Sequence, residues 1–308
     1  MHKIKDERYM DNIRIYKTID EYNKAMGIET LHPLVSFIDF SKTTYNEELP
    51  SAQSFGFYTV FLKDMKCGDL KYGRNYYDYQ EGTLVFLAPN QVLSIENRQP
   101  HQPKGWALMF HPDLLKGSSL GRSIQNYTFF LYEVYEALHL SEQERKIVLE
   151  CFNNIQLELN HNIDNHSQKL IISNIELFLN YCTRFYERQF ITRKHTNSDI
   201  LSRFEKLLNI YFRSDLPQSS GLPTVKYCAD KLNLSPNYFG DLVKKETGKS
   251  PREHIQLQLI EVAKEKICDK SKSVSQIAYE LGFEYPQHFS RFFKRCVGVT
   301  PNEYKESV

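Results

Sequence analysis

Two stretches near the C-terminus of the chain carry the same pattern about fifty residues apart. Five pairs of matched positions are separated by fifty residues: Phe239 and Phe289, Leu242 and Phe292, Lys244 and Lys294, Gly248 and Gly298, and Pro251 and Pro301. Ala229 and Leu234 match Ala278 and Phe283 at a separation of forty-nine, so one residue has been added within 284–287. A repeat of fixed period constrains the architecture before any single residue is weighed. Each copy is typical of a helix, a tight turn and a second helix.

The first copy has the local signals of this arrangement. We expect a helix over 225–232, a turn over 233–235 and a second helix over 236–246. Ser235 can accept hydrogen bonds from the free N–H groups of the second helix, and Pro236 fits its first position because a missing donor costs little there. The apolar residues of this second helix share one face. Its other face carries Asn237, Gly240, Asp241 and Lys244.

The second copy repeats the scheme. Ser273 and Gln276 form a capping-box pattern at the start of its first helix. Its second helix is expected to turn three phenylalanines inward. The outward residues of that helix are then Gln287, Ser290, Arg291 and Lys294.

An exposed polar helix face of this kind fits the major groove of DNA, which is about 12 Å wide and admits one α-helix. Glutamine pairs with adenine and arginine with guanine, so the second copy is expected to be the stronger base reader. A single helix pair with an apolar inner face is equally typical of any surface hairpin. Two in-register copies with the same Gly and Pro endings favour DNA binding. A helix over 252–268 would set the copies about 34 Å apart, which is one turn of DNA.

The charge distribution agrees with this interpretation. The whole chain has a formal net charge of +1, with 39 Lys and Arg against 38 Asp and Glu. Residues 200–308 hold 17 basic and 13 acidic side chains, a net charge of +4, and the preceding part is at −3. The basic end carries the repeat, as neutralisation of DNA phosphates requires.

The 308 residues are enough for roughly two domains. Short β-rich runs at 35–40, 56–62, 82–88, 92–95 and 106–110 are separated by turns, which is typical of a small sandwich or barrel. Beyond 126 the period becomes helical, with a capping box at Ser141 and Glu144 and a second long helix from Ser167 to about Phe190. The wide apolar stripe of that helix indicates packing on the β-domain or on a second copy of the chain.

Several function classes are disfavoured. The six cysteines form no C-x-x-C pair, as expected of buried thiols in a reducing compartment. The N-terminus lacks the apolar core of a signal peptide, and no apolar run approaches the about 20 residues of a membrane span, so we expect a cytoplasmic protein with no membrane contact. The histidines are dispersed, and nucleophile-elbow, phosphate-loop and dinucleotide motifs are absent from the sequence. We therefore expect no metal, no cofactor and no catalysis.

Residues 224–304 resemble the C-terminal domain of AraC/XylS-family transcriptional regulators. The most specific part of the resemblance is 277–304, with Gly282, Phe283, the run His-Phe-Ser-Arg-Phe-Phe-Lys over 288–294, and Pro301. It implies two helix-turn-helix units, 224–247 and 273–297, that bind one face of promoter DNA. It places base contacts at Asn237, Gly240, Asp241, Gln287, Ser290 and Arg291. The chain departs from the family at Gly240, which has no side chain, at the acidic Asp241, and at Leu259, where the family usually carries an arginine.

Residues 77–89 resemble the cupin-type sensory domain of such regulators. The resemblance implies a small-molecule effector inside a β-barrel and dimerisation through the helices that follow. Candidate effector-binding residues are Tyr58, Arg74, Tyr76 and Trp106, for which ordinary barrel core or rim is the alternative. Arg74 and Tyr76 stand where cupin enzymes carry a metal-binding histidine pair, so no metal is expected in this domain.

We therefore predict a multidomain α+β protein. Its parts are a cupin-like sensory β-barrel domain over 1–125, a helical dimerisation segment over 126–192, a linker over 193–198 and an all-α DNA-binding domain over 199–308. The predicted function is sequence-specific regulation of transcription under the control of a small effector. The alternatives are a regulator whose N-terminal domain only dimerises or binds a protein, and a metal-independent cupin enzyme tethered to DNA. Expected partners are promoter DNA, an effector, a second copy of the chain, and RNA polymerase if the protein is an activator.

Overall fold

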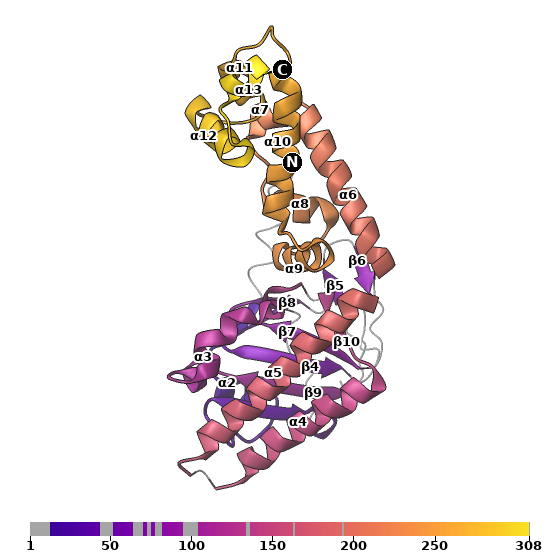
Figure 1. Ribbon diagram of the computed structural model, residues 1–308. Coiled ribbons are helices and arrows are strands. Elements are labelled where there is room, and N and C mark those ends of the chain that lie inside the picture. The colour runs from indigo at the N-terminus through magenta and orange to yellow at the C-terminus, as the bar shows by residue number, and fades with distance from the viewer. Residues whose placement is uncertain are drawn as a thin grey trace. The chain divides into compact units, whose positions relative to one another are not determined.

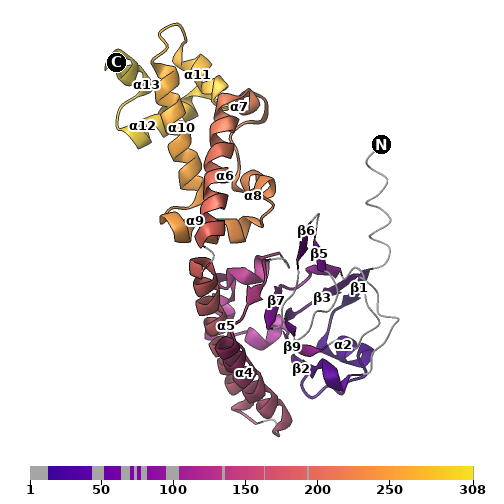
Figure 2. The same ribbon diagram turned by 90° about the vertical axis from the view of Figure 1, so that its right-hand side faces the viewer.

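The computed structural model of the chain describes residues 13–43, 52–63, 70–72, 75–77, 82–94, 104–133, 136–162, 164–192 and 194–307. The chain divides into two compact units, Met1–Ile191 and Thr192–Val308 (Figures 1 and 2). The first unit combines β-sheets with long helices, and the second is helical. The protein is therefore a mixed α+β chain with a separate helical C-terminal unit.

The N-terminal unit is built around a five-stranded antiparallel sheet in the order β10-β7-β4-β9-β2. A second sheet has the order β1-β3-β8, with β1 and β3 parallel, and β5 and β6 form a two-stranded sheet. The strands are β1 Ile13–Tyr16, β2 Val35–Asp39, β3 Ala52–Phe55, β4 Tyr58–Lys63, β5 Leu70–Tyr72, β6 Asn75–Tyr77, β7 Thr83–Leu87, β8 Val92–Ser94, β9 Gly105–Phe110 and β10 Leu138–His139.

One face of the five-stranded sheet shares a hydrophobic core with the three-stranded sheet. Val85 and Met109 enter this core from the first sheet, and Tyr16 and Phe55 enter it from the second. The short helix α2 (Ile19–Ala25) closes one side of the core with buried apolar and aromatic side chains. Because successive side chains of a strand point to opposite faces, the residues between these core positions face the other side of the sheet.

Helices α4 (Glu142–Asn160) and α5 (Ser167–Thr192) lie side by side over that other face (Figures 1 and 2). The rings of Phe86 on β7 and Phe178 on α5 are 6.4 Å apart between centroids, and those of Phe37 on β2 and Phe152 on α4 are 5.5 Å apart. The sheet is thus covered on both faces. Short helices lead from β9 to α4: η2 Pro112–Leu115, α3 Ser119–Ser123, η3 Ile124–Asn126 and η4 Thr128–Leu131, and η1 (Phe40–Lys42) follows β2.

This packing uses the wide apolar stripe of α5. Of the eight apolar residues predicted for this stripe, Leu170 is exposed, and the other seven are buried within the unit: Ile171, Ile175, Phe178, Leu179, Cys182, Phe185 and Tyr186. The width of the stripe therefore gives no support for a second copy of the chain, because the sheet itself covers it.

The five predicted strands correspond to β2, β4, β7, β8 and β9, so these predictions are confirmed. Strands β1 and β3 and helix α2 have no predicted counterpart, although Thr18 and Glu21 form a capping box at the start of α2. A cupin-like barrel is not confirmed, since the described strands form separate sheets without closure.

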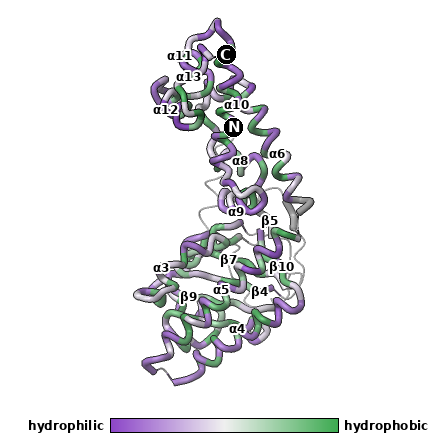
Figure 3. Tube along the Cα trace, in the orientation of Figure 1, coloured by the Kyte–Doolittle hydropathy of each residue, from purple (hydrophilic) through white to green (hydrophobic). Residues whose placement is uncertain are grey.

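In the C-terminal unit, α6 packs against α8, α9 and α10. Hydrophobic and hydrophilic residues alternate along α6 (Figure 3), as expected of an amphipathic helix. The helices of this unit are α6 Lys194–Arg213, α7 Leu216–Ser220, α8 Val225–Leu232, α9 Pro236–Thr247, α10 Pro251–Ile267, α11 Val274–Glu280, α12 Pro286–Val297 and α13 Pro301–Ser307. The helices predicted for the first repeat and for its connection to the second agree to within one residue at each end.

Helix α6 begins at Lys194, so residues 194–198 of the predicted linker over 193–198 are helical. Asn197 is buried, and its amide Nδ2 donates a hydrogen bond of 2.8 Å to Oε1 of Glu246 on α9. This polar contact stabilises the first turn of α6. Because the sequence of that turn has no apolar periodicity, the start of the helix cannot be predicted from hydrophobic patterning.

Within the described ranges, no helix has both the length and the apolar character that crossing a membrane requires.

The core of the N-terminal unit generates a stability prediction. Thr59 is fully buried on β4 between Leu87 and Met109, and its hydroxyl has no hydrogen-bond partner among the described residues. Thr83 is equally buried, but its hydroxyl lies 3.3 Å from Nδ1 of His139. Replacing an unpaired buried hydroxyl by a methyl group removes a desolvation cost. Thr59→Val is therefore expected to raise the free energy of unfolding by about 1 kcal/mol, and Thr83→Val to lower it by about as much.

Urea unfolding of the full chain measures this difference through Trp106, the single tryptophan, which lies in the N-terminal unit. Equal losses of stability in the two variants would contradict the assignment of Thr59 as the unpaired hydroxyl.

Candidate nucleic-acid interface

In the first repeat, helices α8 and α9 meet at a turn whose first residue, Asn233, is in the left-handed conformation with φ 58°. The N–H of Leu234 then donates a 3.0 Å hydrogen bond to the carbonyl oxygen of Ala229, which closes the end of α8. Ser235 caps α9 by accepting from the N–H of Tyr238 at 3.1 Å. The cap predicted at Ser235 is confirmed.

The inner face of α9 holds the repeat to the rest of the unit. Phe239, Leu242 and Val243 are fully buried. The ring of Phe239 stands edge-on to Phe204 of α6, with 4.9 Å between centroids. The apolar face predicted for α9 is confirmed, and it fixes the direction of the opposite, polar face.

In the second repeat the same turn is one residue longer. Gly282 takes the left-handed conformation with φ 88°, and the N–H of Phe283 donates a 3.0 Å hydrogen bond to the oxygen of Ala278. Helix α12 then starts after Tyr285, whose side chain makes no capping bond. The added residue therefore lies between the turn and the start of α12, which agrees with the interval predicted from the sequence.

Helix α12 is anchored by aromatic rings. Phe289 and Phe293 are fully buried, and Phe292 is half-buried against Phe283. Phe293 also contacts Tyr304 of α13 at 5.5 Å between centroids. The three inward phenylalanines predicted here are confirmed, with Phe292 less enclosed than the other two.

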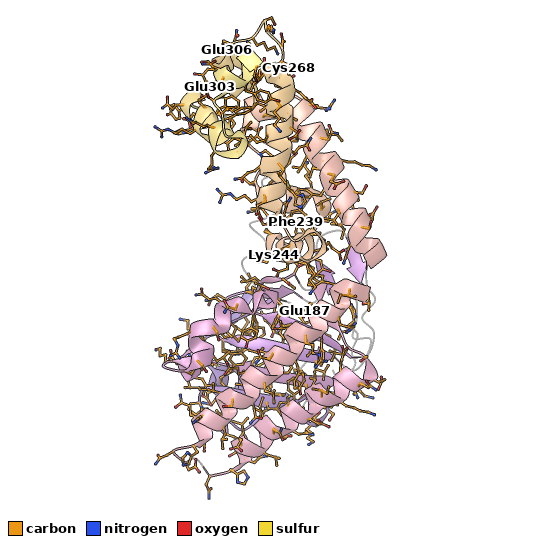
Figure 4. All side chains as sticks on the ribbon, viewed as in Figure 1. Glu187, Phe239, Lys244, Cys268, Glu303 and Glu306 are labelled. Atoms are coloured by element: carbon orange, nitrogen blue, oxygen red, sulfur yellow. The ribbon has the colours of Figure 1, made fainter. Side chains whose placement is uncertain are left out.

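The polar face of α9 is only partly accessible. Asn237, Gly240 and Asp241 are half-buried, whereas Lys244 is exposed. Figure 4 labels Phe239 and Lys244, which mark the buried and exposed sides of this helix. A Cβ at Gly240 would meet no atom of the described residues within 4 Å. The helix carries Asp241 and Glu246 against Lys244 and Lys245, and its net charge is therefore zero.

The polar face of α12 is more accessible and more basic. Gln287, Arg291 and Lys294 are exposed. Ser290 is half-buried, and its hydroxyl donates a 3.1 Å hydrogen bond to the carbonyl oxygen of Pro286. The helix has three basic side chains and no acidic one, a net charge of +3 with histidine neutral. An exposed, basic helix is the more suitable of the two for a phosphate-lined groove.

Sequence reasoning missed part of this face. His288 and Arg295 are exposed on α12 beside Gln287 and Lys294, and Tyr285 is 47% exposed with its ring 5.3 Å from that of His288. Helical spacing predicts His288 and Arg295 once Arg291 is known to face outward, since they lie three residues before it and four residues after it on the same face.

Two of the four candidate effector residues can be placed, and both face the helices rather than the core between the sheets. Tyr58 stacks on Phe110 at 5.1 Å and meets Phe130 at 4.9 Å. Trp106 lies under the guanidinium of Arg145 on α4, 5.7 Å from the ring centroid. Tyr58 and Trp106 occupy the same side of the sheet because β4 and β9 pair in register. Arg74 lies outside the described residues, as does the side chain of Tyr76 on β6.

Metal-ion and thiol chemistry have little support in the part of the chain that the structure describes. No group of three or more His, Cys, Asp or Glu side chains lies close enough there to hold a metal ion. Burial raises the pKa of the Cys151 and Cys228 thiols to about 11, which keeps both neutral at physiological pH.

Residues 228–307 match a family model described as a helix-turn-helix domain. Over 85 residues the chain is 36% identical to the uncharacterized transcriptional regulatory protein YesN of Bacillus subtilis (strain 168), covering 27% of this chain and 23% of YesN. Over 139 residues it is 30% identical to the uncharacterized HTH-type transcriptional regulator YfiF of the same strain, covering 45% of this chain and 41% of YfiF. The chain thus spans less than half the length of each of these relatives.

Among solved structures, the chain is similar to the C-terminal domain of AraT, a response regulator from Geobacillus stearothermophilus. The sequence identity is 28% and the TM-score 0.32, with 35% of this chain and 85% of the other covered.

The geometry of α12 generates a prediction for Arg291. Its guanidinium can form two parallel hydrogen bonds to guanine, which alanine and lysine cannot reproduce. Arg291→Ala is expected to weaken binding to a DNA site selected by the unaltered chain by about 1–3 kcal/mol. Arg291→Lys keeps the charge and should lose discrimination at one base pair while retaining most of the affinity for unrelated DNA.

Fluorescence anisotropy with the selected site and single-base variants of it measures both effects. Two results together would mean that Arg291 contacts phosphate and reads no base: unchanged base specificity in Arg291→Lys, and an equal loss of affinity for the selected site and all its single-base variants in Arg291→Ala.

Proposed function

We propose that this chain, whose C-terminal unit belongs to the AraC/XylS family of DNA-binding domains, is a sequence-specific regulator of transcription. In this proposal α9 and α12 enter neighbouring major-groove segments of promoter DNA, and the N-terminal unit receives the signal that controls binding. The matched relatives are named as transcriptional regulators and not as enzymes, so an enzyme tethered to DNA finds no support among them.

The single observation that carries the proposal is the pair of equivalent turns with two outward helix faces. In each repeat a left-handed residue and one backbone hydrogen bond set the angle of the second helix, whose aromatic or aliphatic inner face is buried. Two such units on one chain can each place a helix in the major groove, about one turn of DNA apart.

We further propose unequal roles for the two units. The DNA contacts at Gln287, Ser290, Arg291 and Lys294 supply most of the base reading, because α12 is exposed and carries three basic side chains. The contacts at Asn237, Gly240, Asp241 and Lys244 mainly position the chain, because α9 is half-covered and electrically balanced.

For the N-terminal unit we propose a small-molecule effector in a cupin-like domain. The buried hydroxyl of Thr59, which has no hydrogen-bond partner in the described part of the chain, supports this proposal, because a polar group of a ligand between the sheets could satisfy it. Tyr58 already packs against Phe130 of η4 and Trp106 against Arg145 of α4, so in this proposal both lie on the helical side of the sheet and not on the ligand side. Arg74 and Tyr76 remain candidates for direct contact.

The alternative is an N-terminal unit that only dimerises or binds a protein. Leu157 of α4 and Leu170 and Leu177 of α5 are about half exposed, and Leu170 and Leu177 share one helix face at a spacing of seven. A homodimer would cover this small apolar surface. Contact with RNA polymerase is part of the proposal only if the regulator activates transcription.

The DNA-binding function is tested by selecting sites from random DNA with the full chain. We expect an enriched motif in two parts whose centres are about 10–10.5 base pairs apart. Because the contacts are largely to phosphate, the affinity should fall by about a thousandfold or more between 50 and 200 mM salt if six or more phosphates are contacted. Failure to enrich any motif would overturn the proposal. A motif with a single part would mean that only one of the two units reads the DNA sequence.

The effector is tested by a thermal-shift screen of metabolites against the full chain, read through Trp106 fluorescence. A true effector is expected to raise the melting temperature of the unaltered chain and to change its affinity for the selected site, and Thr59→Val should reduce the thermal shift. The absence of any stabilising compound across a broad panel would favour the dimerisation or protein-partner alternative.

A further inference from the structure

The second repeat is held from two sides by contacts that lie outside the helix-turn-helix pattern. The first holds its turn. Gly282 is so close to residues 216–221 that a Cβ added to it would lie 2.6 Å from the carbonyl oxygen of Pro217 and 2.9 Å from the carbonyl carbon of Gly221. Both neighbours are backbone atoms, so they cannot move aside as a flexible side chain would. We call residues 216–221, which comprise α7 and Gly221, the α7 strap.

The α7 strap is attached to the first repeat. The hydroxyl of Tyr211, on α6, donates a 2.9 Å hydrogen bond to the carbonyl oxygen of Gly221. Tyr211 is buried, and its ring meets Tyr227 of α8 at 5.2 Å between centroids. Because α6 also packs against α9, the α7 strap connects the turn of the second repeat to the scaffold of the first.

The second contact holds the end of α11. Glu280 accepts a hydrogen bond from Lys266 of α10 and another from Lys272 of the following loop, each at 2.7 Å. These two ammonium groups hold the pKa of the Glu280 carboxyl below its usual range, so it is ionised at neutral pH. Leu259, in the middle of α10, is buried and apolar and offers no polar tie of its own.

We propose that the α7 strap and Glu280 position α12 relative to α9 and thereby set the spacing between the two DNA segments that the chain reads. This inference rests on the proposed function as a two-unit DNA-binding regulator. Gly282, Glu280 and Tyr211 are positioning residues in this scheme and touch no base. They prevent the second repeat from moving relative to the first when the spacing of the DNA half-sites changes.

DNA geometry makes the spacing measurable. One inserted base pair moves the second half-site by about 3.4 Å and rotates it by about 35° around the helix axis. A rigid pair of units would then lose the contacts of one half-site, at about a tenfold cost in affinity or more. A pair joined only by α10 would adapt and lose less.

The test is the ratio of the affinities for the selected site and for the same site with one base pair inserted or removed between its halves. This ratio does not change when a variant merely lowers the fraction of folded protein, since both sites are bound by the same folded molecules. It therefore separates positioning from a general loss of structure. The unaltered full chain is expected to prefer the native spacing by about tenfold or more.

Gly282→Ala and Gly298→Ala form a matched pair. Both positions are left-handed, with φ 88° and 92°, so alanine strains the backbone equally at each. The methyl group collides with the α7 strap at Gly282, whereas at Gly298 no atom of the residues that the structure describes lies within 4 Å of a Cβ. We expect Gly282→Ala to reduce the spacing preference below about threefold, and Gly298→Ala to keep the preference of the unaltered chain.

Glu280→Gln and its control Glu261→Gln form a second pair of variants. They introduce no backbone strain, so they test the inference even if Gly282→Ala does not fold. Glu280 joins two elements, whereas Glu261 pairs with Lys264 within α10 alone, at 2.9 Å. We expect a reduced spacing preference in Glu280→Gln and an unaltered one in Glu261→Gln.

An unchanged ratio in both Gly282→Ala and Glu280→Gln would overturn the inference. An unaltered chain that selects a two-part site yet tolerates inserted base pairs would overturn it while leaving the proposed function intact. If no two-part site is selected at all, the proposed function and this inference fall together.

Discussion

One backbone hydrogen bond in each repeat sets the angle between its two helices. The bond runs from Leu234 to Ala229 in the first repeat and from Phe283 to Ala278 in the second, at 3.0 Å in both. It forms because the residue before the donor adopts the left-handed conformation, as Asn233 and Gly282 do. Once the turn is closed in this way, the apolar face of the following helix is directed inward, and its polar face can only point out.

The same turn is followed by two different helix surfaces. In the first repeat it leads directly to a Ser235 cap, and α9 presents a half-buried, electrically balanced face. In the second repeat an added residue precedes α12, whose N-cap residue Tyr285 makes no side-chain capping bond and whose outer face is exposed and basic. The second repeat also carries the contacts to the α7 strap and to Lys266 and Lys272. The same turn geometry thus leads to two helix faces that differ in exposure and in charge.

Much of the C-terminal unit could be predicted because its signals are local. The turns, the Ser235 cap, the capping box at Ser273 and the buried phenylalanines all follow from residue type and helical spacing. The start of α6 could not be predicted in this way, since Asn197 is held by a hydrogen bond to Glu246, far away in sequence. The close approach of Pro217 to Gly282 is hidden for the same reason, as it joins segments more than sixty residues apart.

The sequence by itself determined the repeat, the strands with clear alternation, and the buried apolar face of both second helices, because each depends on short-range periodicity. Only the tertiary structure decided what the apolar stripe of α5 covers, which side of the sheet Tyr58 and Trp106 occupy, and how the two repeats are tied together. These depend on which surfaces meet in space, and a pattern along one segment specifies that a face is apolar without specifying its partner.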